Sequence, residues 1–319
     1  MRPPRDSAVV LFPGALGDFI CFLPTLQALR ERHAGQLMVV AKPELLDLVE
    51  LPSLATASID RREVADLFVV GKEPVPTTTA LFGGFDFVYS WTGFGNPDFV
   101  GRLAAVSGGQ VGVFRFRGML PGEHAVDYYA RCVGLTAHPV APASIRDDRA
   151  WLRAFRRQYR LGSTDTLVLH AGSGSPSKNW GGFNALMRRW RERYTDMVVL
   201  LRGPAEAHIA TRSGPHIIAL DGLRLPQVAA LLRACSLYLG NDSGISHLAG
   251  AVGARGAVLF GPSDPTTWAP RSDQLRVLHA PTPCISCPQS ALCTHRLSVE
   301  MVMRALEAQR AAGSQSVQL

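Results

Sequence analysis

Three glycine-containing loops, each after a short apolar run, carry residues that could handle a phosphorylated substrate. In the last of them, Ser236 to Leu239 leads into Gly240-Asn241-Asp242, and a helix of small residues is predicted from about Ser243. The first turn of a helix has unpaired backbone N–H groups and a partial positive charge, which suits a phosphate. Asp242 would lie at the carboxyl end of a strand, where it could accept a hydrogen bond from a sugar hydroxyl or simply cap the helix.

The first loop, Pro13-Gly-Ala-Leu-Gly-Asp18, follows the apolar run Ala8 to Phe12 and precedes a predicted helix. Gly14 and Gly17 suit a tight turn in which the backbone approaches a ligand closely. They do not fit the dinucleotide fingerprint G-x-G-x-x-G. Asp18 is therefore a lone carboxylate at the carboxyl end of a strand. From its spacing alone, it suits equally a helix cap and a general base.

The second loop, His170-Ala-Gly-Ser-Gly-Ser-Pro-Ser-Lys-Asn-Trp180, follows a strand predicted over Thr166 to Leu169. Its composition resembles a phosphate loop, but it lacks the glycine that precedes lysine in the Walker pattern. The chain has 33 basic residues, of which only Lys42, Lys72 and Lys178 are lysine. A compact ammonium in such a loop can neutralise charge that develops on a leaving phosphate. A solvated loop lysine is the alternative.

The overall charge favours an anionic partner. The formal net charge is +7, although only 18% of the residues are charged. A phosphorylated substrate, a nucleotide or an acidic membrane surface would suit this excess. Nucleic acid is not expected, because the arginines are dispersed and no basic run alternates with aromatic residues. The apolar stretch Ala8 to Leu23 is interrupted by Pro13, two glycines and Asp18, so we expect neither a signal peptide nor a transmembrane span, and a cytoplasmic location.

The six cysteines leave one question open. Cys284, Cys287, Cys293 and His295 lie within twelve residues and could bind a metal, form a disulfide or be structural. For the reaction itself we expect no metal, because no Asp-x-Asp motif occurs in the chain. Charge on a departing diphosphate would then be met by a helix N-terminus and a cation.

Predicted strands and helices alternate along the chain. Strands are predicted near residues 8–12, 37–41, 55–60, 86–90, 110–114, 166–170, 197–202, 216–220, 236–240, 256–260 and 275–279. Helices are predicted near 17–32, 43–50, 62–68, 97–106, 124–134, 180–193, 204–212, 225–235, 243–253 and 298–312, with a further amphipathic helix around Arg153 to Arg160. Glu73 to Thr79 is predicted as a loop and Pro139 to Ser144 as a linker.

This alternation predicts an α/β fold with two domains, residues 1–145 and 146–319, each Rossmann-like with a parallel sheet. We expect the two domains to face one another across a cleft. The final helix, near 298–312, can pack back on the first domain.

Read together, the motifs resemble glycosyltransferase family 9, the heptosyltransferases of lipopolysaccharide synthesis. The matching stretches are Gly14-Ala-Leu-Gly-Asp18 with Leu23 to Arg30, His170 to Trp180, Gly240 to Ala249 and Leu259 to Pro265. The resemblance implies the two-domain GT-B fold, an inverting mechanism without a metal or cofactor, and ADP-heptose as donor. It also implies a lipid-linked acceptor of the lipopolysaccharide-core type and permits peripheral contact with the inner membrane.

The resemblance also implies roles for individual residues. Asp18 matches the general base and Lys178 the cation that offsets charge on the donor phosphates. The predicted donor-binding residues are Gly14, Gly17, Ser173, Ser175, Glu206, Asp242, Ser243, Gly244 and His247. His247 is equally ordinary as a core histidine.

The acceptor is expected on the N-terminal domain. Arg115 and Arg117 alternate with phenylalanines, so both would face one side of an extended segment and could meet acceptor phosphates or carboxylates. A polar strand face is the alternative. His124 completes the predicted acceptor set, and Trp91, Phe94 and Asn96 also lie near predicted strand ends. A GT-B enzyme for another nucleotide sugar, or a non-catalytic sugar-nucleotide binding protein, are the alternative functions.

Overall fold

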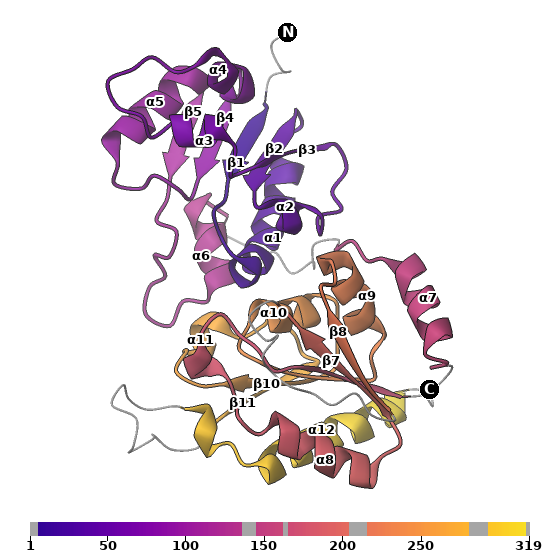
Figure 1. Ribbon diagram of the computed structural model, residues 1–319. Coiled ribbons are helices and arrows are strands. Elements are labelled where there is room, and N and C mark those ends of the chain that lie inside the picture. Colours follow the sequence, from indigo (N-terminus) through magenta and orange to yellow (C-terminus); the bar gives the residue numbers. More distant parts are fainter. Residues whose placement is uncertain (1–5, 136–144, 162–164, 204–215, 281–292, 317–319) are drawn as a thin grey trace. The chain divides into compact units, whose positions relative to one another are not determined.

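The computed structural model describes residues 6–135, 145–161, 165–203, 216–280 and 293–316. The chain forms two compact units, Met1–Ser144 and Ile145–Leu319, here called unit 1 and unit 2. Each unit has its own parallel sheet (Figure 1). Each of the predicted strands is present. The central ones are short apolar runs bounded by glycine, proline or polar residues, a pattern typical of strands buried on both faces.

The sheet of unit 1 has the order β3-β2-β1-β4-β5. Its strands are β1 (Ala8–Leu11), β2 (Leu37–Ala41), β3 (Leu54–Ser58), β4 (Phe87–Ser90) and β5 (Gln110–Val113). Alternate residues Val9 and Leu11 of β1 face a core completed by α3 (Arg62–Asp66), α4 (Pro76–Phe82) and α5 (Pro97–Ser107). The long helix α1 (Leu16–Arg32) packs against α6 (Ala125–Cys132), and the short α2 (Pro43–Leu46) contacts β2 and β3.

The prediction of a loop over residues 73–79 is wrong, because α4 begins at Pro76. Proline is tolerated at the first helical position, where its missing N–H would have no partner in any case. Tertiary contacts then stabilise a segment of threonines with low helix propensity. The Thr78 hydroxyl donates to Asp66 Oδ2 at 2.7 Å, and Phe82 is fully buried.

The sheet of unit 2 has the order β11-β10-β9-β6-β7-β8. Its strands are β6 (Thr166–His170), β7 (Met197–Arg202), β8 (Ile217–Asp221), β9 (Leu237–Asn241), β10 (Gly256–Phe260) and β11 (Leu275–His279). In Figure 1, α8 (Phe183–Arg193) and α12 (Val299–Ser316) cover one face, and α9 (Leu225–Ala234) and α10 (Gly244–Ala251) the other. Helix α7 (Arg149–Gln158) packs on α9, and α11 (Pro265–Trp268) is one short turn.

The final helix packs in the core of its own unit, and its contact with the first domain remains a prediction. Val302, Met303 and Leu306 of α12 are buried in the same core as α8, β9 and β10. These apolar side chains recur at helical spacing, so one face of α12 meets the apolar face of the sheet.

In each sheet, the strand order reverses beside the first strand of the unit. The reversal falls between β1 and β4 in unit 1 and between β6 and β9 in unit 2. Open α/β sheets bind ligands at such switch points, at the carboxyl ends of the strands. The segments after β1, β6 and β9 are the three loops singled out in the sequence.

At Gly256, where β10 begins, the backbones of β10 and β9 approach too closely to leave room for a side chain. Its φ is +154°, and a Cβ there would lie 1.9 Å from the carbonyl oxygen of Tyr238 in β9. We expect Gly256→Ala to lower the free energy of unfolding by about 2–4 kcal/mol, measured by urea denaturation. Gly181→Ala is the control, since nothing lies within 4 Å of its Cβ position. Equal stability of the two variants would contradict this account.

Candidate active-site residues

Asp18 in unit 1 forms a two-point ion pair with Arg117. Asp18 lies in the first turn of α1 and is 4% exposed. Arg117 Nε donates to Asp18 Oδ1 at 3.2 Å, and its terminal nitrogen donates to Oδ2 at 3.0 Å. The arginine side chain is 57% exposed. The acid is therefore the fixed partner, and the guanidinium is the one that reaches solvent.

An aromatic cluster lies beneath this pair. Phe12 at the end of β1 packs on Phe22, Trp91, Phe116 and Tyr129, with ring centroids 4.4–5.9 Å apart. Burial first, and then the charge of Asp18, raise the pKa of Tyr129, which keeps its hydroxyl neutral. The hydrogen bond to Asp18 raises the pKa of Arg117, so the guanidinium stays charged. Nothing in the spacing of Tyr129 indicated this position.

Gly14 gives the loop after β1 its close packing. A Cβ at Gly14 would lie 2.3 Å from the ring of Phe12 and 2.9 Å from the Cβ of Asp18. A side chain at Gly14 would push Asp18 away from its position. Gly17, by contrast, is a half-buried residue of α1 itself.

The predicted acceptor residues follow β4 and β5 but have different surroundings. Both arginines lie beyond the end of β5, and only Arg117 reaches Asp18. The Arg115 guanidinium lies 5.0 Å from the ring centroid of Phe94, which is 52% exposed. His124 caps α6, because its Nδ1 accepts the backbone N–H of Val126 at 3.2 Å. Of the neighbouring positions, Trp91 is buried and Asn96 caps α5.

In unit 2, the structure brings Lys178 and Asp242 together. Lys178 Nζ donates to Asp242 Oδ2 at 2.7 Å, and the two side chains are 31% and 6% exposed. Asp242 follows β9, and Lys178 ends a short 3-10 turn, Pro176–Lys178, in the loop after β6. An ammonium has three N–H donors. The paired lysine therefore retains donors for phosphate oxygens.

Side chains inside the loop hold its shape. The Ser173 hydroxyl lies 2.6 Å from the carbonyl oxygen of Ser175 and 2.7 Å from Asn179 Oδ1. The Ser175 hydroxyl is 2.9 Å from that of Ser177. In this state, Ser173 thus bonds to its own loop, and its proposed contact with phosphate remains a prediction.

The loop is also tied to Asn241, a residue to which sequence reasoning gave no role. Asn241 ends the buried strand β9, and its side-chain amide bonds to both ends of the loop. A signal was present in the sequence: Asn241 is a polar amide at the end of the apolar run Leu237-Tyr-Leu-Gly. A buried amide requires hydrogen-bond partners.

Helix α10 begins at this same place. Ser243 is its N-cap, and its hydroxyl accepts the N–H of Ser246 at 3.4 Å. The same hydroxyl lies 3.3 Å from Nδ1 of the buried His170. Gly244 is the first helical residue, and His247, one turn on, is buried. The backbone N–H groups at the start of α10 therefore lie next to Asp242 and its lysine.

Some predicted residues lie outside the described part of the chain. These are Glu206, Cys284, Cys287, the linker 139–144 and the whole of the predicted helix 204–212. Of the cysteine segment, Cys293 is buried with a free thiol and His295 is exposed. Within the described residues, no group of three or more His, Cys, Asp or Glu side chains is arranged to hold a metal ion. No helix among them is long and apolar enough to span a membrane.

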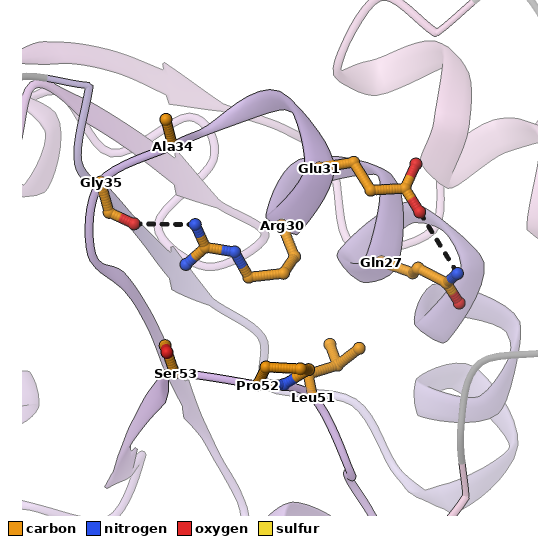
Figure 2. Close-up of a pocket in the computed structure, with 8 residues that line it drawn as sticks. All are labelled: Gln27, Arg30, Glu31, Ala34, Gly35, Leu51, Pro52 and Ser53. Carbon is orange, nitrogen blue, oxygen red and sulfur yellow. Dashed lines mark hydrogen bonds between the residues drawn. The ribbon is translucent and has the colours of Figure 1, made fainter.

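Unit 1 contains a hollow of about 480 Å³, and none of the candidate site residues lines it. It lies between the end of α1, residues 34–35 and residues 51–53 (Figure 2). The last two segments precede β2 and β3, so this hollow is at the amino-terminal edge of the sheet. The Asp18 loop follows the carboxyl end of β1. The candidate site is therefore defined by side chains at the switch points, not by this hollow.

Solved structures with similar folds include three that match nearly the whole chain. A glycosyltransferase family 9 protein from Veillonella parvula has a TM-score of 0.75 at 20% identity and covers 98% of this chain and 99% of its own. ADP-heptose LPS heptosyltransferase II of E. coli has a TM-score of 0.70 at 18% identity, covering 97% and 99%. E. coli heptosyltransferase WaaC, solved with ADP, has a TM-score of 0.67 at 17% identity, covering 95% and 99%. These likenesses confirm the GT-B-type fold of the heptosyltransferases.

Family membership follows from the sequence. Residues 130–295 match the family described as glycosyltransferase family 9 (heptosyltransferase), which is more than half of the chain. The chain belongs to glycosyltransferase family 9 and is a glycosyltransferase of the heptosyltransferase type. A comparison with curated proteins gave no match.

His170 gives a pH dependence to the stability of unit 2. Burial lowers the pKa of His170 from 6.5 to about 4. As the pH falls from 6.5 to 4, the unfolded chain takes up a proton at His170 that the folded chain does not. The free energy of unfolding therefore decreases over this pH range, and His170 causes no decrease above pH 6.5. The loss is about 3 kcal/mol. We expect His170→Asn to flatten the pH dependence of the unfolding free energy by this amount, measured by urea denaturation from pH 7 to 4.

The exposed His295 provides the control, because its replacement by asparagine should leave the pH dependence unchanged. If His170→Asn retains the full decline in stability, His170 is not the buried neutral base described here.

Proposed function

We propose that this protein transfers a heptose from ADP-heptose to a lipopolysaccharide-core acceptor with inversion at the anomeric carbon. The observation that carries the donor half of this proposal is the Lys178–Asp242 pair beside the N-terminus of α10. A cation, a carboxylate and the backbone N–H groups of a helix N-terminus at the switch point of a parallel sheet suit a sugar diphosphate. The heptosyltransferase WaaC, whose fold is similar, was solved with ADP, which supports an adenine nucleotide here.

The reaction requires one in-line displacement. The acceptor hydroxyl oxygen forms a bond to the anomeric carbon, and the bond from that carbon to the diphosphate oxygen breaks. Asp18 takes the hydroxyl proton, and the nucleoside diphosphate leaves with the electron pair. Arg117 occupies one position on each carboxylate oxygen, but a carboxylate accepts about four hydrogen bonds. Asp18 therefore retains lone pairs for the acceptor while Arg117 fixes its plane.

The departing diphosphate gains charge that the protein must offset. Lys178 has N–H groups beyond the one directed at Asp242, and α10 adds the positive end of its dipole. We infer that this set replaces a divalent cation. Asp242, held by Lys178, is proposed to orient the sugar or the ribose, and Ser243, Gly244 and His247 to complete the donor site. Glu206 remains a proposed ribose contact.

The acceptor is proposed to be a lipid-linked, anionic saccharide bound by unit 1. Arg117 is more than half exposed beside the base, and Arg115 stacks on the exposed ring of Phe94. Guanidinium groups bind phosphates and carboxylates with two parallel hydrogen bonds. His124, the N-cap of α6, is proposed as a further contact. Such an acceptor places the enzyme in the cytoplasm, in peripheral contact with the inner membrane.

A panel of nucleotide sugars tests the proposal. The protein is incubated with ADP-heptose, UDP-glucose and GDP-mannose, each with and without a heptose-deficient core acceptor, and each in the presence and absence of EDTA. We expect ADP release only with ADP-heptose and acceptor together, and an inverted anomeric configuration by NMR. Turnover of a UDP-sugar would point to another GT-B enzyme, and binding without turnover of any sugar would indicate a non-catalytic protein. Loss of activity in EDTA would overturn the metal-independent mechanism.

Asp18→Asn removes the proposed base but keeps the volume of the side chain. We expect kcat to fall by about 10²-fold or more while the Kd for the donor changes little, because the amide cannot take the proton. Steady-state kinetics and calorimetry measure the two quantities. Asp98→Asn is the matched control, since Asp98 lies in the first turn of α5 but is exposed. Retained activity in Asp18→Asn would remove the base from the mechanism.

Lys178→Ala should weaken both donor binding and the chemical step. Removal of a group that stabilises developing charge costs about 10²-fold in kcat. It also leaves Asp242 without its cation, so the anionic donor meets an unpaired carboxylate. The comparison variant is Lys72→Ala, because Lys72 is an exposed lysine of unit 1. If the kinetics of Lys178→Ala match those of Lys72→Ala, Lys178 does not act on the phosphates.

A further inference from the structure

We propose that Asn241 is the positioning residue that holds the Lys178 loop in its phosphate-binding shape. The proposal rests on the proposed function, because it assigns to Asn241 the geometry of a cation that acts on the donor. Asn241 is fully buried at the end of β9. Its Oδ1 accepts the backbone N–H of Trp180 at 3.1 Å, and its Nδ2 donates to the carbonyl oxygen of Ala171 at 2.7 Å.

The two halves of one amide thus join the two ends of a single loop. Ala171 is the first residue after β6, and Trp180 follows Lys178 by two residues. An N–H group can only donate and a carbonyl oxygen can only accept, so these partners also define the orientation of the amide. Between the two anchored ends lie Gly172, Gly174 and three serines, a flexible composition. The hydrogen bonds of Ser173 to Ser175 and Asn179 stay within the loop and do not join it to β9.

The anchoring places Lys178 opposite its partner. Asp242 is the residue next to Asn241, and its carboxylate holds Lys178 Nζ at 2.7 Å. The carbonyl oxygen of Asn241 also accepts the Ser246 hydroxyl, 2.5 Å away, from the first turn of α10. One residue therefore fixes the loop through its side chain and contacts the helix through its backbone. Asn241 therefore fixes the position of the Lys178 loop relative to the N-terminus of α10, the two segments proposed to bind phosphate.

Further contacts secure the later part of the loop but cannot replace the amide. The Thr294 hydroxyl donates to the Asn179 carbonyl oxygen at 3.1 Å, and the Trp180 indole N–H donates to the Leu297 carbonyl oxygen at 2.8 Å. Both act on residues after Lys178. Asn241 is the side chain that also bonds to the loop's first residue, so its loss frees the start of the loop.

The test is a double-mutant cycle between Asn241 and Lys178. Asn241→Leu keeps the approximate shape of the side chain and removes both hydrogen bonds, and Asn241→Ala is a second route if leucine disturbs folding. The probe is inorganic pyrophosphate, with affinity measured by calorimetry on the full chain. We expect either variant to weaken binding about tenfold in the presence of Lys178 and to have no further effect in Lys178→Ala. Hydrogen exchange of the unliganded protein should rise over residues 171–180.

Ser236→Ala is the matched control. Ser236 precedes β9, and its hydroxyl bonds to the backbone N–H of Thr166 at 3.1 Å and to Asp165 Oδ1 at 2.9 Å, at the other end of the same strand pair. We expect it to lower stability without changing pyrophosphate affinity or the exchange of residues 171–180. A residue with a merely structural role would behave like Ser236.

Three outcomes overturn the inference: an equal loss of affinity from the Asn241 variants with and without Lys178, unchanged exchange over residues 171–180, or a wild-type protein that does not bind pyrophosphate. None of these measurements depends on turnover. A positive cycle in a protein that transfers no heptose would instead retain the inference and reject the proposed function.

Discussion

The parallel register of β6 and β9 determines which groups meet in unit 2. It pairs His170 with Gly240, so the next residues, Ala171 just after β6 and Asn241 at the end of β9, lie side by side. The chain then continues into the Lys178 loop after β6 and into α10 after β9. A slip of one residue would turn every side chain of β9 to the other face. The contacts of the asparagine, the ion pair and the helix cap all depend on this alignment.

The two units use the same electrostatic arrangement with different cations. Each has a buried aspartate just after a strand or in the first turn of the helix that follows it, paired with a more exposed cation. Arginine pairs with Asp18 through two parallel bonds, which fix the plane of the carboxylate. Lysine pairs with Asp242 as a point charge with other donors free to turn. The Asp18–Arg117 geometry suits a carboxylate that acts as a base. The Lys178–Asp242 geometry suits an ammonium that contacts both Asp242 and a bound anion.

The strands and the three loops could be predicted from the sequence because their signals are local. Apolar runs of four to six residues bounded by glycine or proline indicate strands, and their carboxyl ends give the candidate side chains. The pairing of Asp18 with Arg117 could not be predicted in this way, because it joins residues 99 apart through the order β1-β4-β5. Helix α4 was missed because a hydrogen bond to Asp66 outweighs the weak propensity of its threonines.

The place of α12 in the core has a consequence for synthesis of the chain. The last helix, through Val302, Met303 and Leu306, packs with α8 on one face of the sheet. It thereby completes the core of a unit whose first strand begins at Thr166. Residues 6–135 contain a whole sheet and its helices. On the ribosome, domains generally fold as units in the order in which they emerge. Unit 1 can therefore fold before the residues of α12, which complete the core of unit 2, have been synthesised.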